Sequence, residues 1–404
     1  MKKFSMNAHN LTGLAAIVVF MGMCIPAGAQ SYTFTEWATP TASSLPLHVI
    51  PVSSTEFYFT ENAKNRIGAV NISSNTVTEW VLPAASMPHS ITLDASGNIV
   101  FAAFSGNYVG VYNPNATTLQ LTKYPIPTAG GGIIHLDTQL SPENAPEYFF
   151  SEATANKMGL LDPNAVGGPS VTEWNIPTAS STPRGVSIGG ADGTGTQVFF
   201  AELNTHKIGM LDTFTNDITE WTIPSVRQVE HLHYVNGLVY FGDLATSVVG
   251  ILNPVTNELK EWQAPTTSAD VPDVFVVGTN FYFSERAGTK IGFLNTTAQT
   301  PWKDVILKGA SVVVTPETPT TTAVTATPVT LTPKTTPVQP TITQVSGVAN
   351  GGFTEWTVPT SASGPLGING VGSMVVFAEY YGSKVATVVP TASPIRPTAA
   401  PDGQ

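Results

Sequence analysis

The sequence predicts an all-β protein, a seven-bladed β-propeller of four-stranded blades. Three observations predict it. A Thr-Glu-Trp phrase recurs along the 404-residue chain, an apolar run ending in an acid alternates with it, and most copies lie about 41 to 50 residues apart. A period near 40 to 45 residues that contains several short strands is typical of propellers. Charged residues make up only 11% of the chain, and abundant Thr, Ser, Gly and Pro suit short strands and tight turns.

The first 29 residues are typical of a signal peptide. Lys2 and Lys3 precede a mostly apolar run from Leu11 to Ile25, and Ala27-Gly28-Ala29 is a small-residue cleavage site. The apolar run is short for a membrane span. We therefore expect a secreted or periplasmic protein with no membrane span after signal removal. Cys24, the single cysteine, lies in this segment, so the mature chain has no disulfide and no thiolate ligand.

The charge balance argues against nucleic acid as a partner. The formal net charge is −11, and removal of the signal leaves 15 basic against 28 acidic side chains. An acidic surface of this kind repels polyanions and anionic lipid. We expect a monomer, with no nucleic acid as partner.

The Thr-Glu-Trp phrase is expected to form the outermost strand of each blade, with its tryptophan ring covering the gap between blades. The copies are Thr35–Trp37, Thr78–Trp80, Thr172–Trp174, Thr219–Trp221, Lys260–Trp262 and Thr354–Trp356, with Thr122–Tyr124 as a weaker one.

The alternating phrase is expected to form the second and third strands. The second strands end in Glu61, Glu152, Glu202, Asp243, Glu285 and Glu379, while blade 2 has Ala103 instead. Acids this regular are not a catalytic set, so we expect them to bond to backbone or to a neighbouring blade. A glycine such as Gly68 follows the apolar residue of the third strand, and we expect it to let neighbouring sheets approach closely.

The ends of the chain fit a closed ring, in which the strand from Tyr32 to Trp37 joins the last blade. The propeller is expected to span residues 30–390, with a disordered tail at 391–404. A Thr/Pro-rich region at about 308–350 interrupts the repeat, and its composition predicts a flexible, extended insertion. Segments around Trp302 and Trp356 compete for the outer strand of blade 6. The first has the expected spacing, and the second, which we favour, matches the phrase.

Residues found in only some of the repeats are the better candidates for function. Five of the seven histidines fall on the predicted innermost strands, which converge on one axis: His48, His89, His135, His231 and His233. Blades 4 and 6 have Arg184 and Asp273 at the corresponding place. The densest spot is Glu230-His231-Leu232-His233, where strand alternation puts both histidines on one face. With Asp243, this run indicates a base or a metal site, and the alternative is polar channel-lining residues bound to water.

The repeat as a whole resembles the virginiamycin B lyase, or streptogramin lyase, family. The resemblance rests on Thr-Glu-Trp-x-x-Pro, then Pro-x-Gly/His-Ile/Val, then Phe-x-Glu with Lys-Ile-Gly, from about Thr33 to Val389 apart from the insertion. It implies enzymes that linearise cyclic depsipeptides by elimination. We therefore expect the ligand at the mouth of the propeller to be a small cyclic peptide, or another peptide or glycan. A base removes a proton beside the ester carbonyl, and a bound Mg²⁺ stabilises the enolate-like oxygen.

The resemblance and the histidine cluster together give the site candidates. The catalytic candidates are His231, His233 and His89, and Glu230 and Asp243 are the candidate ligands of Mg²⁺. In the family, histidines in successive units work with a carboxylate after the second. His48 and His89 are in successive units, but Ala103 stands where that carboxylate belongs, and the unit before His231 offers Arg184.

Two other functions remain open at this stage. One is a non-enzymatic binding propeller that presents one face to a peptide, a glycan or another exported protein. The other is a sugar-lactone hydrolase, which centres a Ca²⁺ with acids and asparagines from several inner strands. Inner strands rich in histidine fit that chemistry least.

Overall fold

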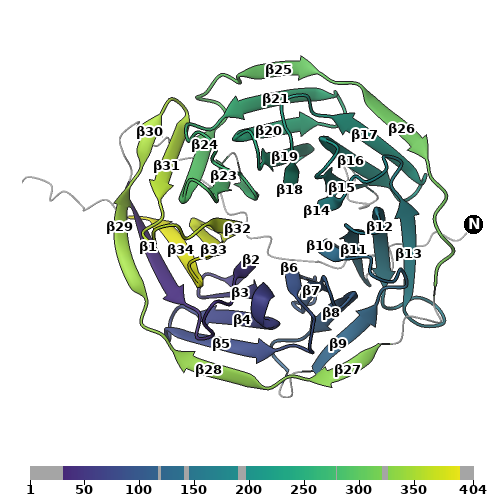
Figure 1. The fold of residues 1–404 in the computed structure, drawn as a ribbon, viewed down its shortest axis with the longest axis horizontal. Helices are drawn as coiled ribbons and strands as arrows, with labels where there is room; N and C mark the ends of the chain where they lie inside the picture. The colour runs from purple at the N-terminus through teal and green to yellow at the C-terminus, as the bar shows by residue number, and fades with distance from the viewer. Residues whose placement is uncertain are drawn as a thin grey trace, which may run out of the picture.

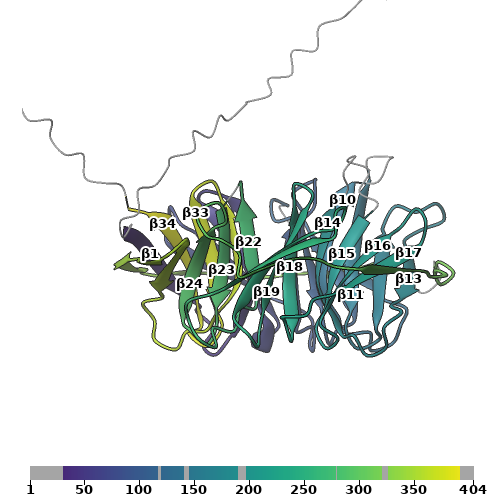
Figure 2. The same cartoon turned by 90° about the horizontal axis from the view of Figure 1, so that it is seen from above.

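The computed structural model describes residues 31–391, except 117–119, 141–144, 190–196, 279 and 321–325. The predicted signal peptide, and the predicted tail beyond residue 391, lie outside these described residues. Seven β-sheets stand around a central channel (Figure 1), and the ring is a shallow disc when seen from its edge (Figure 2). The predicted seven-bladed propeller is therefore confirmed. Within the described ranges there is no helix long and apolar enough to cross a membrane.

Each blade is built from four antiparallel strands in the order of the repeat, from the channel outward. Blades 1 and 2 are β2(Pro46–Ser53), β3(Glu56–Glu61), β4(Arg66–Asn71), β5(Thr76–Val81) and β6(Pro88–Leu93), β7(Ile99–Ala103), β8(Tyr108–Tyr112), β9(Gln120–Pro125). Blades 3 and 4 are β10(Ile133–Leu140), β11(Pro146–Glu152), β12(Lys157–Asp162), β13(Ser170–Asn175) and β14(Pro183–Gly189), β15(Gln197–Glu202), β16(Lys207–Asp212), β17(Asp217–Thr222). Blade 5 is β18(Val229–Val235), β19(Leu238–Asp243), β20(Val248–Asn253) and β21(Glu258–Gln263).

The last two blades use strands that are distant in sequence. Blade 6 is β22(Val274–Val277), β23(Asn280–Glu285), β24(Lys290–Asn295) and β31(Phe353–Thr357). Blade 7 is β32(Pro365–Val371), β33(Met374–Glu379), β34(Lys384–Pro390) and β1(Ser31–Ala38). The segment around Trp356 is thus the outer strand of blade 6, as its phrase predicts. The first strand of the chain pairs with the last, with Phe34 opposite Val388.

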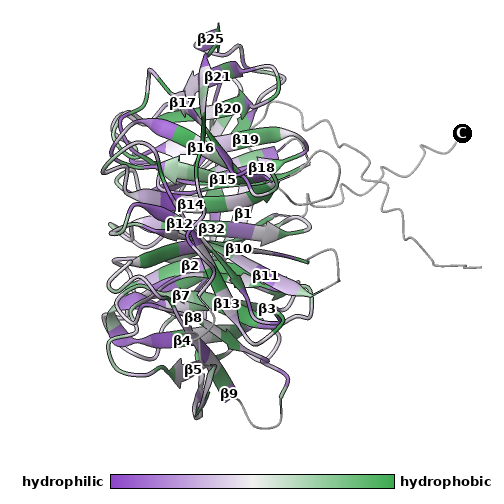
Figure 3. Ribbon diagram, turned by 90° about the vertical axis from the view of Figure 1, so that its right-hand side faces the viewer, coloured by the Kyte–Doolittle hydropathy of each residue, from purple (hydrophilic) through white to green (hydrophobic). Residues whose placement is uncertain are grey.

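The hydrophobic core lies between adjacent blades rather than within any one of them. The second strands are apolar on both faces because each is covered by a blade on either side, and Phe199 and Phe200 are both fully buried. Along the strands, hydrophobic and hydrophilic segments alternate (Figure 3). The outer tryptophans close the gaps as predicted. Trp221 is buried, and its indole N–H donates to Asn257 of the next blade at 2.6 Å.

The glycine of the third strand has a different role from the predicted one. A Cβ added to Gly209 would lie 2.1 Å from the ring of Phe200, which sits directly opposite it in the same blade. Gly68 meets Phe59 in the same way. The glycine therefore makes room for an aromatic ring within the blade, and the approach of neighbouring sheets does not depend on it.

Residues 303–350, here called the belt, form a fifth and outermost layer. In chain order its strands are β25(Lys303–Ile306), β26(Gly309–Val313), β27(Thr327–Thr330), β28(Pro333–Pro337), β29(Thr341–Ser346) and β30(Val348–Asn350). They pair with the outer strands of blades 5, 4, 2, 1, 7 and 6, and Thr320 bridges to Val171 of blade 3. The belt thus passes round the whole ring against the order of the blades (Figure 1).

The belt corrects the picture of a free, flexible insertion. It is extended, as its composition predicts, but each of its described strands is paired with the outer strand of a blade. Leu331 is 4% exposed and packs in the cluster that contains Trp80 and Tyr112. The Thr335 hydroxyl bonds to Thr78 at 2.9 Å. Prolines lack the N–H that a further strand would need, so the outward edge of the belt is poorly suited to edge-to-edge pairing.

Most second-strand acids pair with a glutamate of their own blade, which differs from the bonding that we expected. Glu152 lies against Glu173, and the outer glutamate, Glu173, is bound by Lys157 at 3.1 Å and by the hydroxyl of Thr128, in the loop that joins blades 2 and 3, at 2.7 Å. Burial first, and then the neighbouring carboxylate, raise the pKa of Glu152 to about 9. The pKa is raised to about 8 or 9 in the same way at Glu61, Glu202, Glu285 and Glu379.

These carboxyl pairs predict a propeller that loses stability in mild alkali. The raised pKa means that each inner carboxyl is protonated in the folded protein and ionised in the unfolded chain above its ordinary pKa. The folded state therefore binds more protons, and stability falls as pH rises towards 8 to 9. Calorimetry at intervals above about pH 7.5, roughly one unit above the ordinary pKa of histidine, should show a falling melting temperature. A rise with pH would contradict this assignment.

The Glu152→Gln variant makes the test specific. An amide can keep a hydrogen bond to Glu173 but cannot ionise, so the variant should show a shallower fall with pH. Lys157 and Glu317, which also face this pair, stay unchanged. The half-exposed Glu258, changed to Gln, is the matched control and should leave the slope as it is.

Candidate functional site

A recurring β-bulge aims residues of the innermost strands at the channel. In blade 1, Pro46 pairs with Glu61 and the next pair is Val49 with Phe59, so two inner residues face only Thr60. A bulge of this kind bends the strand and redirects side chains. The same shift occurs in blades 2, 3, 4, 5 and 7. The bulged pairs are Leu47-His48, His89-Ser90, Ile134-His135, Arg184-Gly185, Glu230-His231 and Leu366-Gly367.

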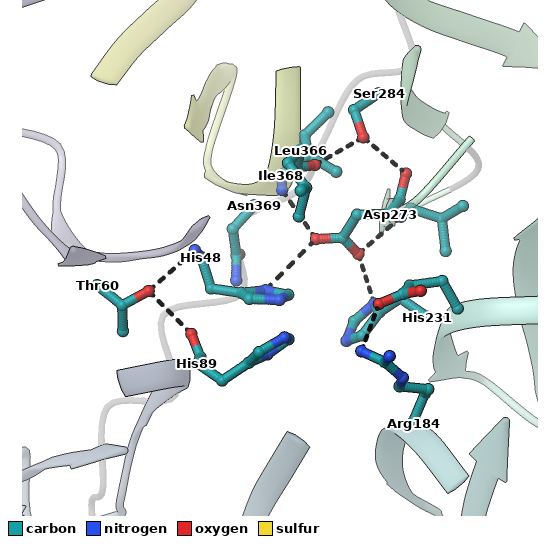
Figure 4. A network of polar contacts seen from close by, with 12 residues as sticks. His48, Thr60, His89, Arg184, His231, Asp273, Ser284, Leu366, Ile368 and Asn369 are labelled. Carbon is teal, nitrogen blue, oxygen red and sulfur yellow. Dashed lines mark hydrogen bonds and ion pairs between the residues drawn. The ribbon is translucent and has the colours of Figure 1, made fainter. Parts of the chain in front are cut away.

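Four histidines from four blades meet at the axis. The ring centroid of His48 lies 5.4 Å from that of His89 and 4.7 Å from that of His135. His231 approaches from the other side, with its ring centroid 4.9 Å from that of His135 and 5.9 Å from that of His48. Figure 4 shows His48 and His89 pointing into the same space as His231. The convergence expected of the innermost strands is therefore present for these four.

Asp273 is the carboxylate of the cluster, and it precedes the innermost strand of blade 6. Its Oδ1 lies 2.5 Å from Nδ1 of His231 and accepts the N–H of Val274, while its Oδ2 lies 3.8 Å from Nδ1 of His48 (Figure 4). The amide of Ile368 in blade 7 also donates to Oδ2, at 2.9 Å. Asp273 thus connects blades 1, 5, 6 and 7 at the axis.

Burial sets the protonation of the cluster. It lowers the pKa of His48 and of His89 to about 3, and that of His135 well below its usual value. Burial also acts on His231, but Asp273 outweighs it, so that the pKa of His231 is raised. The contact with His231 holds the pKa of Asp273 below its ordinary value despite burial. The site therefore contains three neutral imidazoles beside one imidazole that is paired with a carboxylate.

Two glycines on the bulges allow this close approach. A Cβ on Gly367 would lie 2.3 Å from the backbone oxygen of Leu47 and 2.6 Å from Cα of His48. A Cβ on Gly185 would lie 2.7 Å from Cα of His231. Backbone atoms cannot move aside as a flexible side chain can, so a side chain at either position would displace the adjacent histidine.

The other predicted site residues have different surroundings. Glu230 accepts from Arg184 at 3.2 Å, so the arginine of blade 4 and the glutamate of blade 5 form an ion pair at the channel. His233 stacks on Phe275, with ring centroids 5.8 Å apart. Burial, and then His231, lower the pKa of His233 to about 4.

Asp243 does not join the histidines. Its Oδ1 accepts the amides of Arg227 and Gln228, and its Oδ2 accepts the amides of Ala245 and Thr246 and the hydroxyl of Thr246. A fully buried carboxylate with five donors has no lone pair left for a metal. The structure therefore gives Asp243 a turn-stabilising role. The residue that sequence reasoning left out of the site is Asp273. It could have been identified because it occupies the position in blade 6 that corresponds to the histidines of the other blades.

The run Gly185-Val186-Ser187-Ile188-Gly189 has the form of a nucleophile-elbow motif but lacks the required structure. That motif needs a sharp turn between a strand and a helix. Here the run lies within strand β14, and the buried Ser187 accepts the amide of Tyr234 from blade 5 at 3.0 Å. It is a connection between blades.

A cleft of about 460 Å³ leads to the arginine of this site. Its lining includes Phe104, Ile134, Thr154, Thr182 and Arg184, from the facing edges of blades 2, 3 and 4. A second cleft of about 420 Å³ lies at the rim, between blade 5 and the belt, and none of the axial residues line it.

Comparisons of the sequence and of the structure with known proteins point to the same family. The model of the virginiamycin B lyase family matches residues 24–289. The chain is similar to crystal structures of virginiamycin B lyase from Staphylococcus aureus. One is the selenomethionine protein, with 18% identity, a TM-score of 0.65, and coverage of 89% of this chain and 99% of that chain. The other is a catalytically inactive His-to-Ala variant with quinupristin, with 18% identity, a TM-score of 0.66 and the same coverage.

A streptogramin B lyase structure is also similar, with 16% identity, a TM-score of 0.67, and coverage of 89% of this chain and 98% of that chain. At these identities the structural likeness shows the fold alone. No curated protein matches the chain.

Proposed function

The chain belongs to the virginiamycin B lyase family, and from that membership we propose that it opens a cyclic, ester-containing peptide by elimination, with His231 as general base. The observation that carries the proposal is the pair formed by His231 and Asp273 at the axis, with 2.5 Å between Nδ1 and Oδ1. An imidazole held by a buried carboxylate is the usual arrangement of a catalytic base.

Asp273 fixes the form in which His231 reacts. Because Nδ1 lies 2.5 Å from the carboxylate, a proton is favoured on Nδ1, and the neutral imidazole then carries its free lone pair on Nε2. When Nε2 takes a proton, Asp273 stabilises the imidazolium that forms. The amides of Val274 and Ile368 hold Asp273 in place, so the base is positioned before substrate binds.

In the proposed reaction, Nε2 of His231 removes a proton from the carbon beside a carbonyl. The electron pair of the broken C–H bond becomes the carbon–carbon double bond, while the alkyl–oxygen bond of the ester breaks and the carboxylate leaves. Negative charge develops on the carbonyl oxygen and on the leaving group. Arg184 lines the cleft beside the site, and its Nε is buried without a partner among the described residues, so it can stabilise that charge.

The Mg²⁺ that the family implies does not fit the described donors. Mg²⁺ requires oxygen ligands in near-octahedral geometry. The oxygens of Asp273 are used by His231, by the facing His48 and by two backbone amides, and Glu230 is paired with Arg184. Asp243 is saturated by its turn. We therefore assign no step to Mg²⁺.

The alternative of a purely binding propeller predicts histidines scattered at different depths without a shared carboxylate. Four histidines that converge beside Asp273 favour a reactive site instead. The lactone hydrolase alternative calls for acids and asparagines at the axis, where this chain has imidazoles. The proposal includes export, which the character of residues 1–29 supports.

The experiment is incubation of the purified mature chain with a streptogramin B depsipeptide such as quinupristin, followed by mass spectrometry. Elimination opens the ring without changing the mass, whereas hydrolysis adds one water, so the product distinguishes the two reactions. Parallel incubations with and without a chelator separate turnover that needs a metal from turnover that does not. Absence of ring opening in every condition would refute the proposal.

A further inference from the structure

We propose that His48, His89 and His135 form a binding site for a divalent transition-metal ion of the zinc class in the central channel. Each residue offers one nitrogen, and the three nitrogens lie within 4.8 Å of one another. The inference does not depend on the lyase reaction, because it concerns metal binding by residues of blades 1, 2 and 3 and not the base on blade 5.

The donor atoms are available. Nδ1 of His89 and Nε2 of His135 are buried, and neither has a hydrogen-bond partner among the described residues. His135 is only 1% exposed. Buried polar atoms without partners cost free energy, and two of them on rings whose centroids lie 5.2 Å apart indicate a missing ligand.

The donor chemistry selects the class of ion. Neutral imidazole is a common ligand of Zn²⁺, Cu²⁺, Ni²⁺ and Fe²⁺, whereas Mg²⁺ and Ca²⁺ prefer oxygen. Burial keeps these imidazoles neutral, so their lone pairs do not have to be freed from protons first. Three histidines with an open fourth position are one of the known arrangements of zinc in proteins.

The spacing requires only a small adjustment. Zinc–nitrogen bonds of about 2.0–2.1 Å in a tetrahedral site place the nitrogens roughly 3.3 Å apart. Binding would therefore draw the three rings inward by about 1 Å, which rotation of the side chains can supply.

The surroundings orient the rings in the manner of an outer ligand shell. Nδ1 of His48 faces Asp273 at 3.8 Å, which leaves Nε2 of His48 for the metal. The Thr60 hydroxyl accepts the amide of His48 and donates to the carbonyl of His89, so it fixes the two strands relative to each other (Figure 4). The Ser151 hydroxyl accepts the amide of His135.

The test is titration of the untagged, metal-stripped mature protein. Zn²⁺ is followed by calorimetry, and Co²⁺ by its visible absorption, which reports coordination number and nitrogen ligation. We expect one site per chain, occupied even with millimolar Mg²⁺ present. His89→Gln and His135→Gln should each weaken Zn²⁺ binding by more than the roughly 10- to 100-fold that is typical of an outer-shell change.

The matched control is His206→Gln, because His206 lies in a turn outside the cluster. It should bind Zn²⁺ like the unchanged protein. Melting curves without metal show whether each variant is folded, and Zn²⁺ should raise the melting temperature of the unchanged protein but not of His89→Gln. Absence of Zn²⁺ binding, or equal binding by His89→Gln and the control, would overturn the site. Neither result bears on the lyase proposal, whose readout is ring opening.

Discussion

The Asp273→Asn variant is expected to turn over a cyclic, ester-containing peptide about 10³- to 10⁴-fold more slowly than the unchanged protein, while it remains folded. The asparagine side chain has nearly the same shape and can still accept the amide of Ile368. It carries no charge, however, and its amide nitrogen can bond to an unprotonated Nδ1. The proton of the neutral imidazole of His231 would then sit on Nε2, where the reaction needs a lone pair.

Steady-state kinetics and nitrogen NMR together check this expectation. The loss should appear in kcat and in kcat/KM to the same extent, because the contact acts mainly in the transition state. The ¹⁵N shifts of His231 should report a proton on Nδ1 in the unchanged protein and on Nε2 in the variant. Asp304→Asn, at an exposed position of the belt, is the control and should keep full activity. Full activity of Asp273→Asn would exclude His231 as a carboxylate-positioned base.

Replacing the belt by a short Gly/Ser loop between β24 and β31 is expected to lower stability by roughly 5 kcal/mol or more, from lost strand pairing and lost apolar burial. For a domain of this size that is about a 10 °C fall in melting temperature. The outer strands of all seven blades would become exposed edges, so we also expect aggregation above the concentrations that the unchanged protein tolerates.

Calorimetry and light scattering measure these two effects. Single substitutions test whether the belt acts through its contacts. Leu331→Ala removes a side chain that is 4% exposed and should destabilise by about 2 kcal/mol or more, whereas Val348→Ala, at a position that is 69% exposed, should have little effect. A belt-free protein that is as stable and soluble as the original would show that the layer is dispensable.

The blades were predictable because each contains the same strand-length phrases in the same order. The axial meeting of the histidines also followed, since first strands of different blades converge on one line in any propeller. The β-bulge that directs the histidines to the axis could not be predicted from the sequence, because it depends on how the first strand pairs with the second. The hydrogen bonds of the Asp243 carboxylate could not be predicted from the sequence either. Its oxygens are taken by amides of Arg227, Gln228, Ala245 and Thr246, which only the folded loops bring together.

The belt shows a different limit of sequence reasoning. Its Thr- and Pro-rich composition offers no apolar face of its own, and in isolation such a segment stays unpaired. It becomes ordered on the ring because the outer strands, such as β5 and β17, present unpaired N–H and C=O groups to it. The partner strands are up to 315 positions away in the chain, as the contact between Ser31 and Ser346 shows.

The path of the belt also bears on the order and speed of folding. It lies between the third and fourth strands of blade 6, so that blade cannot be completed until the segment has travelled round its six neighbours. The belt can reach its place only after the outer strands of the six other blades exist, so we expect it to dock late and to be absent from the folding nucleus. Contacts that form after the transition state slow unfolding rather than speed folding. We expect the belt to act chiefly by lowering the rate of unfolding, which lengthens the lifetime of the native ring against proteases.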